Sequence, residues 1–320
     1  MTPDRDGPAA RPAPGANPAA EASPGAGVLT LIAPPEAPLA AETVALARDG
    51  VAAAGGRAAE VAWLGPTACD IPFEGAEPSA VEAAVRAGLA GRPVDLAAQP
   101  ARGRRKRLLV ADMESTIVTR ELLDELAGLA GLRDEVAAVT ARSMRGEVDF
   151  AESLRRRAAM LAGLDASLID RVRALIELTP GARTLVATMR AHGAYTMLVS
   201  GGFDCFTAVA ARACGFDEHR GNRLVVENGR LAGSVGDPIL GAAGKLAALE
   251  EAAAARGLSP ADAAAVGDGA NDIPMLRAAG LGVAFRGKPA VTAAARHRLD
   301  YADLTGLLYM QGYRAADFVS

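Results

Sequence analysis

The 320-residue sequence predicts an α/β fold, with a doubly wound parallel sheet as its main body and a small α+β domain before it. Short apolar runs alternate with helical stretches over the last two thirds of the chain, a pattern typical of a parallel sheet covered by helices. Half of the residues are hydrophobic, which is enough for a sizeable core, and the length suits about two domains of roughly 150 residues each.

Composition and charge argue against several classes of protein. The formal net charge of −4 disfavours a general binder of nucleic acids. Three scattered cysteines form neither a disulfide framework nor a CxxC zinc motif, which fits a reducing compartment. The first residues lack the apolar core of a secretory signal, and no stretch approaches the ~18 uninterrupted apolar residues of a membrane span. We therefore expect a soluble cytoplasmic protein without nucleic-acid or membrane partners, and a homodimer is compatible with the sequence.

The N-terminal part of the chain predicts a tail and a small domain. Residues 1–26 are rich in proline, alanine and glycine without periodicity, which predicts a disordered tail. The elements predicted next are strand 28–32, helix 38–54, strands 61–64 and 69–73, helix 79–89 and strand 94–97. Their order, β-α-β-β-α-β, predicts a small ferredoxin-like domain over residues 27–99.

A polar, basic segment, residues 100–107, is predicted to link the two domains. Its run Arg104-Arg105-Lys106-Arg107 could form a nucleic-acid patch, but four charges in an acidic chain make a poor footprint for a polyanion. We expect a solvated entrance to the next strand.

The main domain, residues 108–320, is predicted from buried-type strands with helices between them. In chain order the elements are strand 108–111, a run of helices over about 121–179, strand 195–199, a helix from 203, a hairpin over 224–235, helix 242–256 and strands 263–266 and 281–285. Asp112, Ser200 and Asp268 each follow a strand. Because the carboxyl ends of parallel strands meet at one edge of the sheet, these side chains are expected to lie together.

Asp112 and Glu114 form a candidate catalytic pair on the turn after the first of these strands. Carboxylates two positions apart on a tight turn can point into one pocket, where one attacks as a nucleophile and the other moves a proton. The alternative is that Asp112 only caps the next helix.

Two glycine loops and one lysine add to this pair. Ser200-Gly201-Gly202 offers a hydroxyl and unhindered backbone N–H groups, which suit an anion, although an ordinary glycine turn is the alternative. Loop 267–272 carries clustered carboxylates, which suit Mg²⁺, with a plain turn as the alternative. Lys245 could neutralise phosphate charge, although a lone lysine is usually solvated surface.

Together these motifs resemble those of the haloacid dehalogenase-like phosphatases, and among them the phosphoserine phosphatase family. The resemblance rests on Asp112-Met113-Glu114-Ser115-Thr116 with Glu121-Leu122-Leu123-Asp124-Glu125-Leu126-Ala127, on Ser200-Gly201-Gly202-Phe203, on Gly267-Asp268-Gly269-Ala270-Asn271-Asp272, and on Met144-Arg145-Gly146-Glu147-Val148-Asp149-Phe150 with Ser153-Leu154-Arg155-Arg156-Arg157. It covers about residues 108–310 and implies a Rossmann-like core with a helical cap over about 121–179.

The resemblance implies hydrolysis of O-phospho-L-serine through an aspartyl-phosphate, as the last step of serine biosynthesis. Asp112 would attack phosphorus, and Glu114 would protonate the leaving serine oxygen and then activate water. Mg²⁺ would be held by Asp112, the backbone carbonyl of Glu114 and Asp268, with Asp272 in or near the second shell of ligands.

The resemblance also implies how the substrate is bound. The phosphate would be held by Ser200, Gly201, Lys245 and Asn271. Glu121 suits the ammonium of phosphoserine, and Arg157 suits its carboxylate through bidentate hydrogen bonds. From the residues alone, Glu121 is an acid at a helix start and Arg157 a surface arginine.

Two features depart from the family pattern. The second acidic position usually carries aspartate, and Glu114 keeps the carboxylate but adds a methylene. We therefore expect the same reaction type at an altered rate. Residues 27–99 resemble a degenerate relative of the ACT domains, which bind small ligands and are attached to some of these phosphatases.

Other interpretations stay open. Residues 282–289 nearly form a phosphate-binding P-loop, but Pro289 follows Lys288 where a hydroxyl is required for Mg²⁺. Within the same chemistry, the alternative is a phosphatase or phosphotransferase for another small phosphomonoester. A non-catalytic amino-acid sensor is the alternative from another class, although a sensor has no need for a nucleophile such as Asp112.

Overall fold

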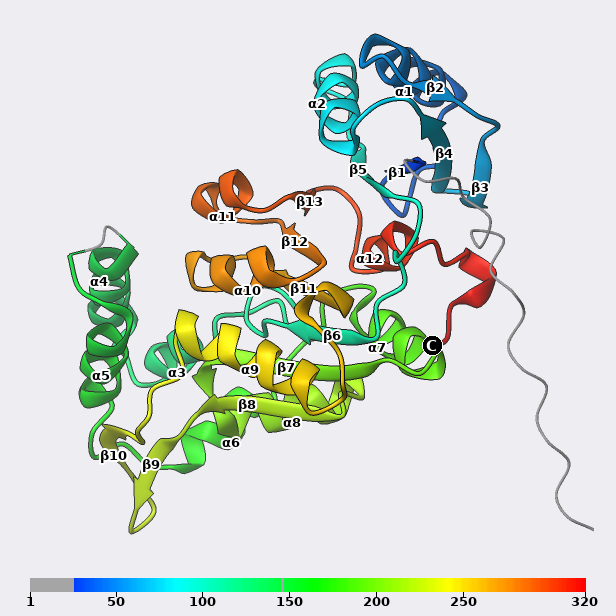
Figure 1. Cartoon of the computed structure of the whole chain (residues 1–320). Coiled ribbons are helices and arrows are strands. Elements are labelled where there is room, and N and C mark those ends of the chain that lie inside the picture. Colours follow the sequence, from blue (N-terminus) through cyan, green and yellow to red (C-terminus); the bar gives the residue numbers. More distant parts are fainter. Residues whose placement is uncertain (1–25, 145–146) are drawn as a thin grey trace, which may run out of the picture.

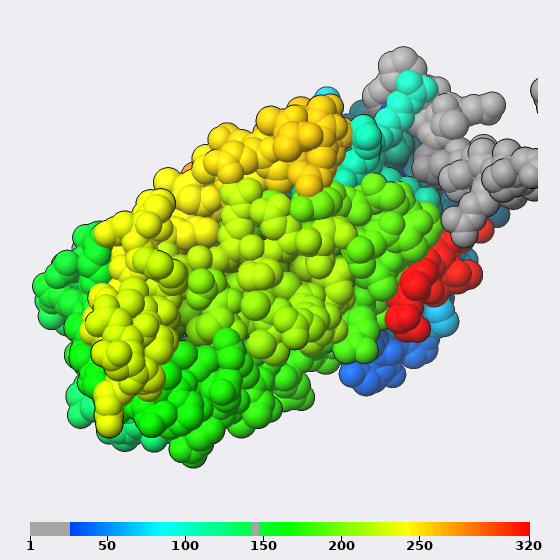
Figure 2. Space-filling model, turned by 90° about the horizontal axis from the view of Figure 1, so that it is seen from below, coloured from blue at the N-terminus to red at the C-terminus, as the bar shows by residue number. Residues whose placement is uncertain are grey.

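The computed structural model describes residues 26–144 and 147–320. The predicted tail 1–26 therefore lies almost wholly outside the described residues, and so do Arg145 and Gly146 of the motif at residues 144–150. Figure 1 shows a small N-terminal unit at one end of a larger body that holds the main sheet. In the space-filling view of Figure 2, the N-terminal residues (blue) and the C-terminal residues (red) lie at the same end of the molecule.

The N-terminal unit, residues 27–100, is an antiparallel sheet with two helices on one face. Its elements are β1 (Gly27–Ile32), α1 (Ala41–Ala53), β2 (Arg57–Ala58), β3 (Ala62–Gly65), β4 (Ala68–Glu74), α2 (Pro78–Gly88) and β5 (Asp95–Pro100). The sheet order is β2-β4-β1-β5, with β3 also paired to β4, and β1 runs antiparallel to both neighbours. The predicted order of elements is present, with the two-residue β2 added.

Alternation along β1 buries this sheet on both faces. Leu29 and Leu31 pack with apolar residues of α1 and α2. Ile32, on the other face, belongs to the core of the main body, together with C-terminal residues such as Leu307. The N-terminal unit and the main body therefore share a hydrophobic core.

Arg104 anchors the segment between the two sheets. Its guanidinium forms an ion pair with Asp70 of β4 at 2.6 Å and donates to the Thr30 hydroxyl at 2.8 Å. It also donates to the carbonyls of Tyr309 and Met310 at 3.2 Å each. The Arg104 side chain is only 10% exposed, so the prediction of a solvated basic run is wrong at this position. The reason is that a buried carboxylate, here that of Asp70, requires a cation.

Two further carboxylates of the N-terminal unit bind the C-terminal part of the chain. Asp95 accepts the backbone N–H groups of residues 300–302 at 2.8 to 3.0 Å. Glu82 lies 3.0 Å from Nδ1 of His297. These contacts fix the N-terminal unit against the edge of the main sheet.

In the described part of the chain, the main body is a six-stranded parallel sheet with helices on both faces, as predicted. Its strands are β6 (Leu108–Ala111), β7 (Tyr195–Phe203), β8 (Glu218–Asn222), β11 (Ala263–Gly267), β12 (Leu281–Phe285) and β13 (His297–Leu299). They pair in the order β13-β12-β11-β6-β7-β8. The helices are α7 (Ala182–Ala191), α8 (Asp204–Cys214), α9 (Ala242–Ala254), α10 (Ile273–Ala278), α11 (Pro289–Ala294) and α12 (Gly306–Met310), with 3₁₀ turns at η2 (Pro260–Asp262), η3 (Ala270–Asp272) and η4 (Ala315–Asp317).

Alternate residues of β6 point to opposite faces of this sheet. Leu108 and Val110 pack with residues of α9 and α10, whereas Leu109 and Ala111 pack with residues of α7, α8 and α12. Burial on both sides explains why the predicted strands are continuous apolar runs.

The structure differs from the prediction at β7 and at the sheet edges. β7 continues through Ser200-Gly201-Gly202 to Phe203, and its pairing with β8 is irregular after Val199. The two edge strands, β8 and β13, are absent from the prediction, because they carry polar residues in place of an apolar run.

Helices fill the segment between β6 and β7 that is predicted to be helical. They are α3 (Leu122–Leu129), α4 (Arg133–Met144), α5 (Phe150–Met160) and α6 (Ser167–Arg173). Figure 1 shows α4 and α5 side by side at the end of the molecule opposite the N-terminal unit. The predicted hairpin, β9 (Leu224–Glu227) and β10 (Arg230–Val235), packs against α5, and its turn has positive φ at Asn228 and Gly229.

Among the described residues, no helix combines the length and the apolar character needed to cross a membrane.

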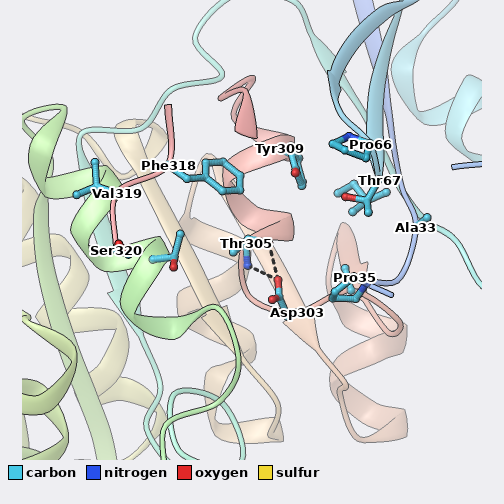
Figure 3. A pocket seen from close by; sticks show the side chains of 13 residues that line it. Ala33, Pro35, Pro66, Thr67, Asp303, Thr305, Tyr309, Phe318, Val319 and Ser320 are labelled. Atoms are coloured by element: carbon cyan, nitrogen blue, oxygen red, sulfur yellow. Dashed lines mark hydrogen bonds between the residues drawn. The ribbon is translucent and has the colours of Figure 1, made fainter. Parts of the chain in front are cut away.

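A cavity of about 470 Å³ lies at the junction of the N-terminal unit with the C-terminal residues. Figure 3 shows Pro66 and Thr67 on one side of it and Phe318 and Val319 on the other. None of the predicted site residues lines this junction cavity.

Candidate active site

The predicted site residues meet at the carboxyl edge of the main sheet. Asp112 follows β6, Asp268 follows β11, and Ser200 lies near the end of β7. A cavity of about 110 Å³ opens there. It is lined by Asp112, Glu114, Glu121, Leu123, Asp124, Phe150, Leu154, Arg157, Ser200, Gly201, Gly202, Asp268, Asn271 and Lys288. The two predicted residues outside this lining, Lys245 and Asp272, are fully buried next to Asp112.

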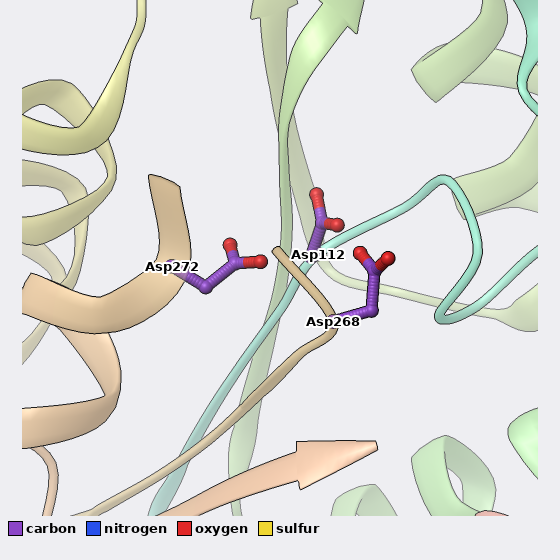
Figure 4. A group of neighbouring side chains, drawn as sticks. All are labelled: Asp112, Asp268 and Asp272. Carbon is purple, nitrogen blue, oxygen red and sulfur yellow. The ribbon is translucent and has the colours of Figure 1, made fainter. Parts of the chain in front are cut away.

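Three aspartates could hold a metal ion. Figure 4 shows the carboxylates of Asp112, Asp268 and Asp272 gathered around one space. One oxygen from each lies within 4.8 Å of the others, and all three residues are buried. Carboxylates this close repel one another unless cations neutralise them. Carboxylate oxygens are ligands that Mg²⁺ prefers, so the donor set fits the predicted ion.

Asp272 reaches this cluster through a glycine-rich turn. It ends η3, and its Oδ2 accepts the Gly269 N–H at 3.0 Å. A Cβ on Gly267 would lie 2.4 Å from Cγ of Asp272. Glycine at position 267 is therefore required for the close approach of the carboxylate.

Lys245, in the first turn of α9, is fully buried between two of these aspartates. Its Nζ donates to Oδ1 of Asp112 at 2.5 Å and to Oδ1 of Asp272 at 2.6 Å. Burial acts to lower the pKa of Lys245, but the two carboxylates outweigh burial and raise the pKa above its ordinary value. A charged lysine thus neutralises part of the cluster, and the described residues use two of its three N–H donors.

The pKa values of both catalytic candidates are raised. Burial raises the pKa of Asp112 well above its ordinary value, the charge of Asp272 adds to the rise, and Lys245 opposes it. Burial also raises the pKa of Glu114 to about 7, with a contribution from Glu121. A cation among the aspartates would lower the pKa of Asp112, since opposite charge favours the ionised form. Glu114 can exchange a proton near neutral pH.

A tight turn directs Glu114 into the cavity. Ser115 has a left-handed backbone with φ of 55°. Oε1 of Glu114 accepts the Leu122 N–H at 2.7 Å, which holds the carboxylate against the start of α3. A Cβ on Gly202 would lie 2.7 Å from Oε2 of Glu114. Glycine at position 202 therefore leaves room for the longer acidic side chain.

The segment from Ser200 to Gly202 forms another part of the wall. The Ser200 hydroxyl accepts the Gly202 N–H at 2.9 Å. A Cβ on Gly201 would lie 2.8 Å from Cζ of Phe150 and 3.5 Å from Nδ2 of Asn271. Glycine at position 201 therefore allows α5 to approach. It also keeps the Ser200 hydroxyl, the Gly201 backbone and the Asn271 amide close together. Such a group of donors suits an anion.

Two charged residues come from the helical segment. Glu121 is the N-cap residue of α3, and its Oε1 accepts the Ser115 hydroxyl at 2.9 Å. Arg157 lies on α5, where Nε donates to the Ser153 carbonyl at 3.4 Å. Both side chains line the cavity, and the terminal nitrogens of Arg157 have no hydrogen-bond partner in the described part of the chain. The cavity thus offers one acid and one free guanidinium end beside the anion donors.

Sequence reasoning missed two charged residues of this cavity. Asp124 lies three positions after Glu121 in the same helical stretch, and this spacing could have indicated it. Nζ of Lys288 lies 3.0 Å from Oδ2 of Asp268 and 3.8 Å from Oε1 of Glu121. In the sequence Lys288 stands out only within an incomplete P-loop, although it follows a parallel strand just as Asp268 does.

The chain is similar to known proteins over most of its length. The family model of the haloacid dehalogenase-like hydrolases matches residues 109–277. A phosphoserine phosphatase of Streptomyces coelicolor is 44% identical over 248 residues, which cover 77% of this chain and 60% of the relative. The match with this curated relative therefore spans about three fifths of its length.

Solved structures are similar as well. The unliganded structure of a probable phosphoserine phosphatase from Vibrio cholerae is 29% identical with a TM-score of 0.73, and it covers 92% of this chain and 88% of that chain. A phospho-aspartyl intermediate analogue of phosphoserine phosphatase is 36% identical with a TM-score of 0.60, and it covers 64% of this chain and 98% of that chain. The likeness to the Vibrio protein extends over the N-terminal unit, because so little of the chain is left uncovered.

Proposed function

The chain belongs to the haloacid dehalogenase-like hydrolase family, and we propose that it hydrolyses O-phospho-L-serine to L-serine and phosphate, the last step of serine biosynthesis. One observation carries the proposal: Asp112, Ser200 and the pair Glu121 and Arg157 come from separate segments and line one cavity. A phosphate monoester requires a nucleophile and hydrogen-bond donors to the phosphate. The amino-acid part requires an anionic side chain for its ammonium and a cationic side chain for its carboxylate. This set supplies all four.

Asp112 acts as the nucleophile. Its carboxylate oxygen forms a bond to phosphorus while the bond from phosphorus to the serine oxygen breaks, which gives an aspartyl-phosphate. Glu114 donates its proton to the departing oxygen, and a pKa of about 7 keeps a protonated fraction at neutral pH. The Leu122 N–H holds the Glu114 carboxylate in place. A similar protein has been solved as a phospho-aspartyl intermediate analogue, which supports this step.

Glu114 then acts as a base. Ionised by the first step, it takes a proton from the water molecule whose oxygen attacks the phosphorus of the aspartyl-phosphate. The bond between phosphorus and the Asp112 oxygen breaks, phosphate leaves, and Glu114 is protonated again. Both catalytic residues return to their starting states.

Asp112 and Asp268 would hold Mg²⁺, with the backbone carbonyl of Glu114 as the third ligand predicted from the sequence and Asp272 nearby. The ion, when bound, neutralises phosphate charge and orients the phosphoryl group. Lys245 favours the ionised Asp112, and its remaining N–H donor can serve a phosphate oxygen. Spreading charge over several donors is the main contribution a protein makes to phosphoryl transfer.

The amino-acid part of the substrate is recognised by the helical segment. Glu121 binds the ammonium, and the free end of Arg157 binds the carboxylate. Phe150, which lies against Gly201 and Gly241, closes one side of the cavity with an apolar ring and excludes water.

We also propose a division of the chain into an ACT-like domain over 27–99, a linker over 100–107 and a phosphatase domain over 108–320. The helices of about 121–179 would form a cap on the phosphatase domain. The cytoplasmic location, the homodimer and the lack of nucleic-acid and membrane partners stay predictions.

Phosphate release from L-phosphoserine, phosphothreonine and an aryl phosphate tests the proposal, for the wild type and for Asp112→Asn. We expect selective release from phosphoserine, which the substitution and chelation of Mg²⁺ both abolish. Release from the aryl phosphate alone would keep the chemistry and reject the substrate. A folded protein that binds Mg²⁺ and releases phosphate from none of the three would reject the proposed function.

A further inference from the structure

Lys288 has no task in the proposed mechanism, yet it binds Asp268 twice. Its backbone N–H donates to the Asp268 carbonyl at 2.9 Å, and its Nζ lies 3.0 Å from Oδ2 of the same residue. The side chain of Asp268 is 8% exposed and that of Lys288 is 44% exposed. The lysine therefore reaches from the rim of the cavity to a buried carboxylate.

Local structure fixes the position of Lys288. It is the N-cap residue of α11, and its carbonyl accepts the N–H groups of Val291 and Thr292 at 3.0 Å each. The Thr292 hydroxyl donates to the Gly287 carbonyl at 2.9 Å, which closes the loop between β12 and α11. Both backbone groups of Lys288 are thus held, and its side chain is directed to Asp268.

In the described part of the chain, Asp268 has no other basic partner. Lys245 is paired with Asp112 and Asp272. Without Lys288, the carboxylate of Asp268 would be buried with no cation to hold either of its oxygens.

We propose that Lys288 is a positioning residue for the metal: it holds one oxygen of the Asp268 carboxylate and so directs the other toward the ion. This inference rests on the proposed function, because it requires Asp268 to be a metal ligand. A carboxylate can serve a lysine and an ion at once through its two oxygens. Groups that bind the outer side of a metal ligand orient it, and their removal typically costs ~10–100-fold in metal affinity.

Charge repulsion predicts the opposite change in Mg²⁺ affinity, so the direction of the change distinguishes the two effects. A lysine near a metal site repels a divalent ion, so loss of Lys288 through this effect alone would tighten metal binding. Glu121 lies 3.8 Å from the same Nζ, however, so two carboxylates share the lysine and neutralise its charge. We therefore expect orientation of Asp268 to outweigh repulsion.

Calorimetric titration of the full chain with Mg²⁺, without substrate, tests the proposal in the wild type, Lys288→Met and Lys288→Arg. The matched control is Arg286→Met, which removes a charge from the same loop. Arg286 lies over the ring of Phe285, 5.2 Å from its centroid, and forms no ion pair among the described residues. The Kd for Mg²⁺ is expected to rise ~10–100-fold in Lys288→Met, to recover most of the way in Lys288→Arg, and to stay unchanged in Arg286→Met.

Phosphatase activity at saturating Mg²⁺ gives a second readout. Activity of Lys288→Met should return toward that of the wild type, which a damaged fold would not allow. Unchanged or tighter Mg²⁺ binding by Lys288→Met would overturn the proposal, and so would an equal loss in Arg286→Met. A wild type that binds no Mg²⁺ would instead reject the metal of the proposed function, so the two failures are distinguishable.

Discussion

Replacement of Glu114 by glutamine isolates its proton from its other contributions. Glutamine has the same length, and its amide oxygen can accept the Leu122 N–H that Oε1 of Glu114 accepts at 2.7 Å. The substitution removes the proton that Glu114 donates and the carboxylate that later acts as a base. Proton transfer by a positioned side chain contributes ~10²–10⁴-fold to a rate, which is roughly 3–5 kcal/mol of barrier. With phosphoserine, kcat of Glu114→Gln is expected to fall by that factor with little change in KM.

The leaving group separates the acid role of Glu114 from its base role. The serine oxygen is a poor leaving group unless it is protonated, whereas a nitrophenolate leaves without a proton. Glu114→Gln should therefore release p-nitrophenol from p-nitrophenyl phosphate in a stoichiometric burst, at the rate of the first step in the wild type with this poorer substrate, and then stall, because hydrolysis of the aspartyl-phosphate still requires a base. Rapid-mixing absorbance measures the burst, and Asp112→Asn, which lacks the nucleophile, should show none.

A different outcome would refute the reasoning. If the burst rate with the aryl phosphate falls as far as kcat falls with phosphoserine, Glu114 does not act as the acid, because the need for a proton then does not depend on the leaving group. A Glu114→Gln variant that turns over phosphoserine at the wild-type rate would remove both roles. The hydrogen bond to Leu122 would then be its main contribution.

Three further predictions concern stability and the metal. Arg104→Met leaves the carboxylate of Asp70 buried without its cation, which typically costs about 3–5 kcal/mol, whereas Arg57→Met breaks only an exposed pair and should cost less than ~1 kcal/mol. Thermal melts measure the loss of stability in both variants. Adding Asp70→Asn to Arg104→Met should recover part of that loss. Equal melting temperatures for Arg104→Met and Arg57→Met would contradict the prediction. Burial acts to raise the pKa of Glu82, but the hydrogen bond and charge of His297, together with hydrogen bonds from the Ala98 N–H and from Arg86, outweigh it and lower the pKa below its ordinary 4.5. Its contribution to stability is thus complete above pH 4.5 and is lost as the pH falls through the lower folded value, so the acid side of a melting-temperature profile should flatten in Glu82→Gln. Chelation with EDTA should abolish phosphate release and added Mg²⁺ should restore it; release that persists after chelation would reject the metal.

The parts of the site that could be predicted are those set by local pattern. A buried strand that ends in Asp112 or in Asp268 can be recognised within a few residues, and parallel strands bring such ends together. Glu121 and Arg157 required the resemblance, because by themselves they have the pattern of a helix-end acid and a surface arginine. The structure brings all four to one cavity.

Features that depend on distant partners could not be predicted. Arg104 belongs to a polar run in the sequence, yet it is buried because Asp70 and the carbonyl of Met310, 206 residues further along the chain, converge on it. Asp95 likewise finds its donors at residues 300–302. No local pattern records such pairs, so the way in which the N-terminal unit is fixed to the main sheet required the structure.

The lysines show that composition holds a signal that local pattern misses. The chain has 34 basic residues, but only Lys106, Lys245 and Lys288 are lysine. Arginine thus supplies almost every basic side chain of the chain, and the three lysines are exceptions to this usage. Lys245 is enclosed between two aspartates, and its side chain is fully buried. Lys106 donates to two backbone carbonyls. Lys288 bonds the carboxylate of Asp268 from a half-exposed position, where arginine can keep the charge, so Lys288→Arg is the informative conservative change.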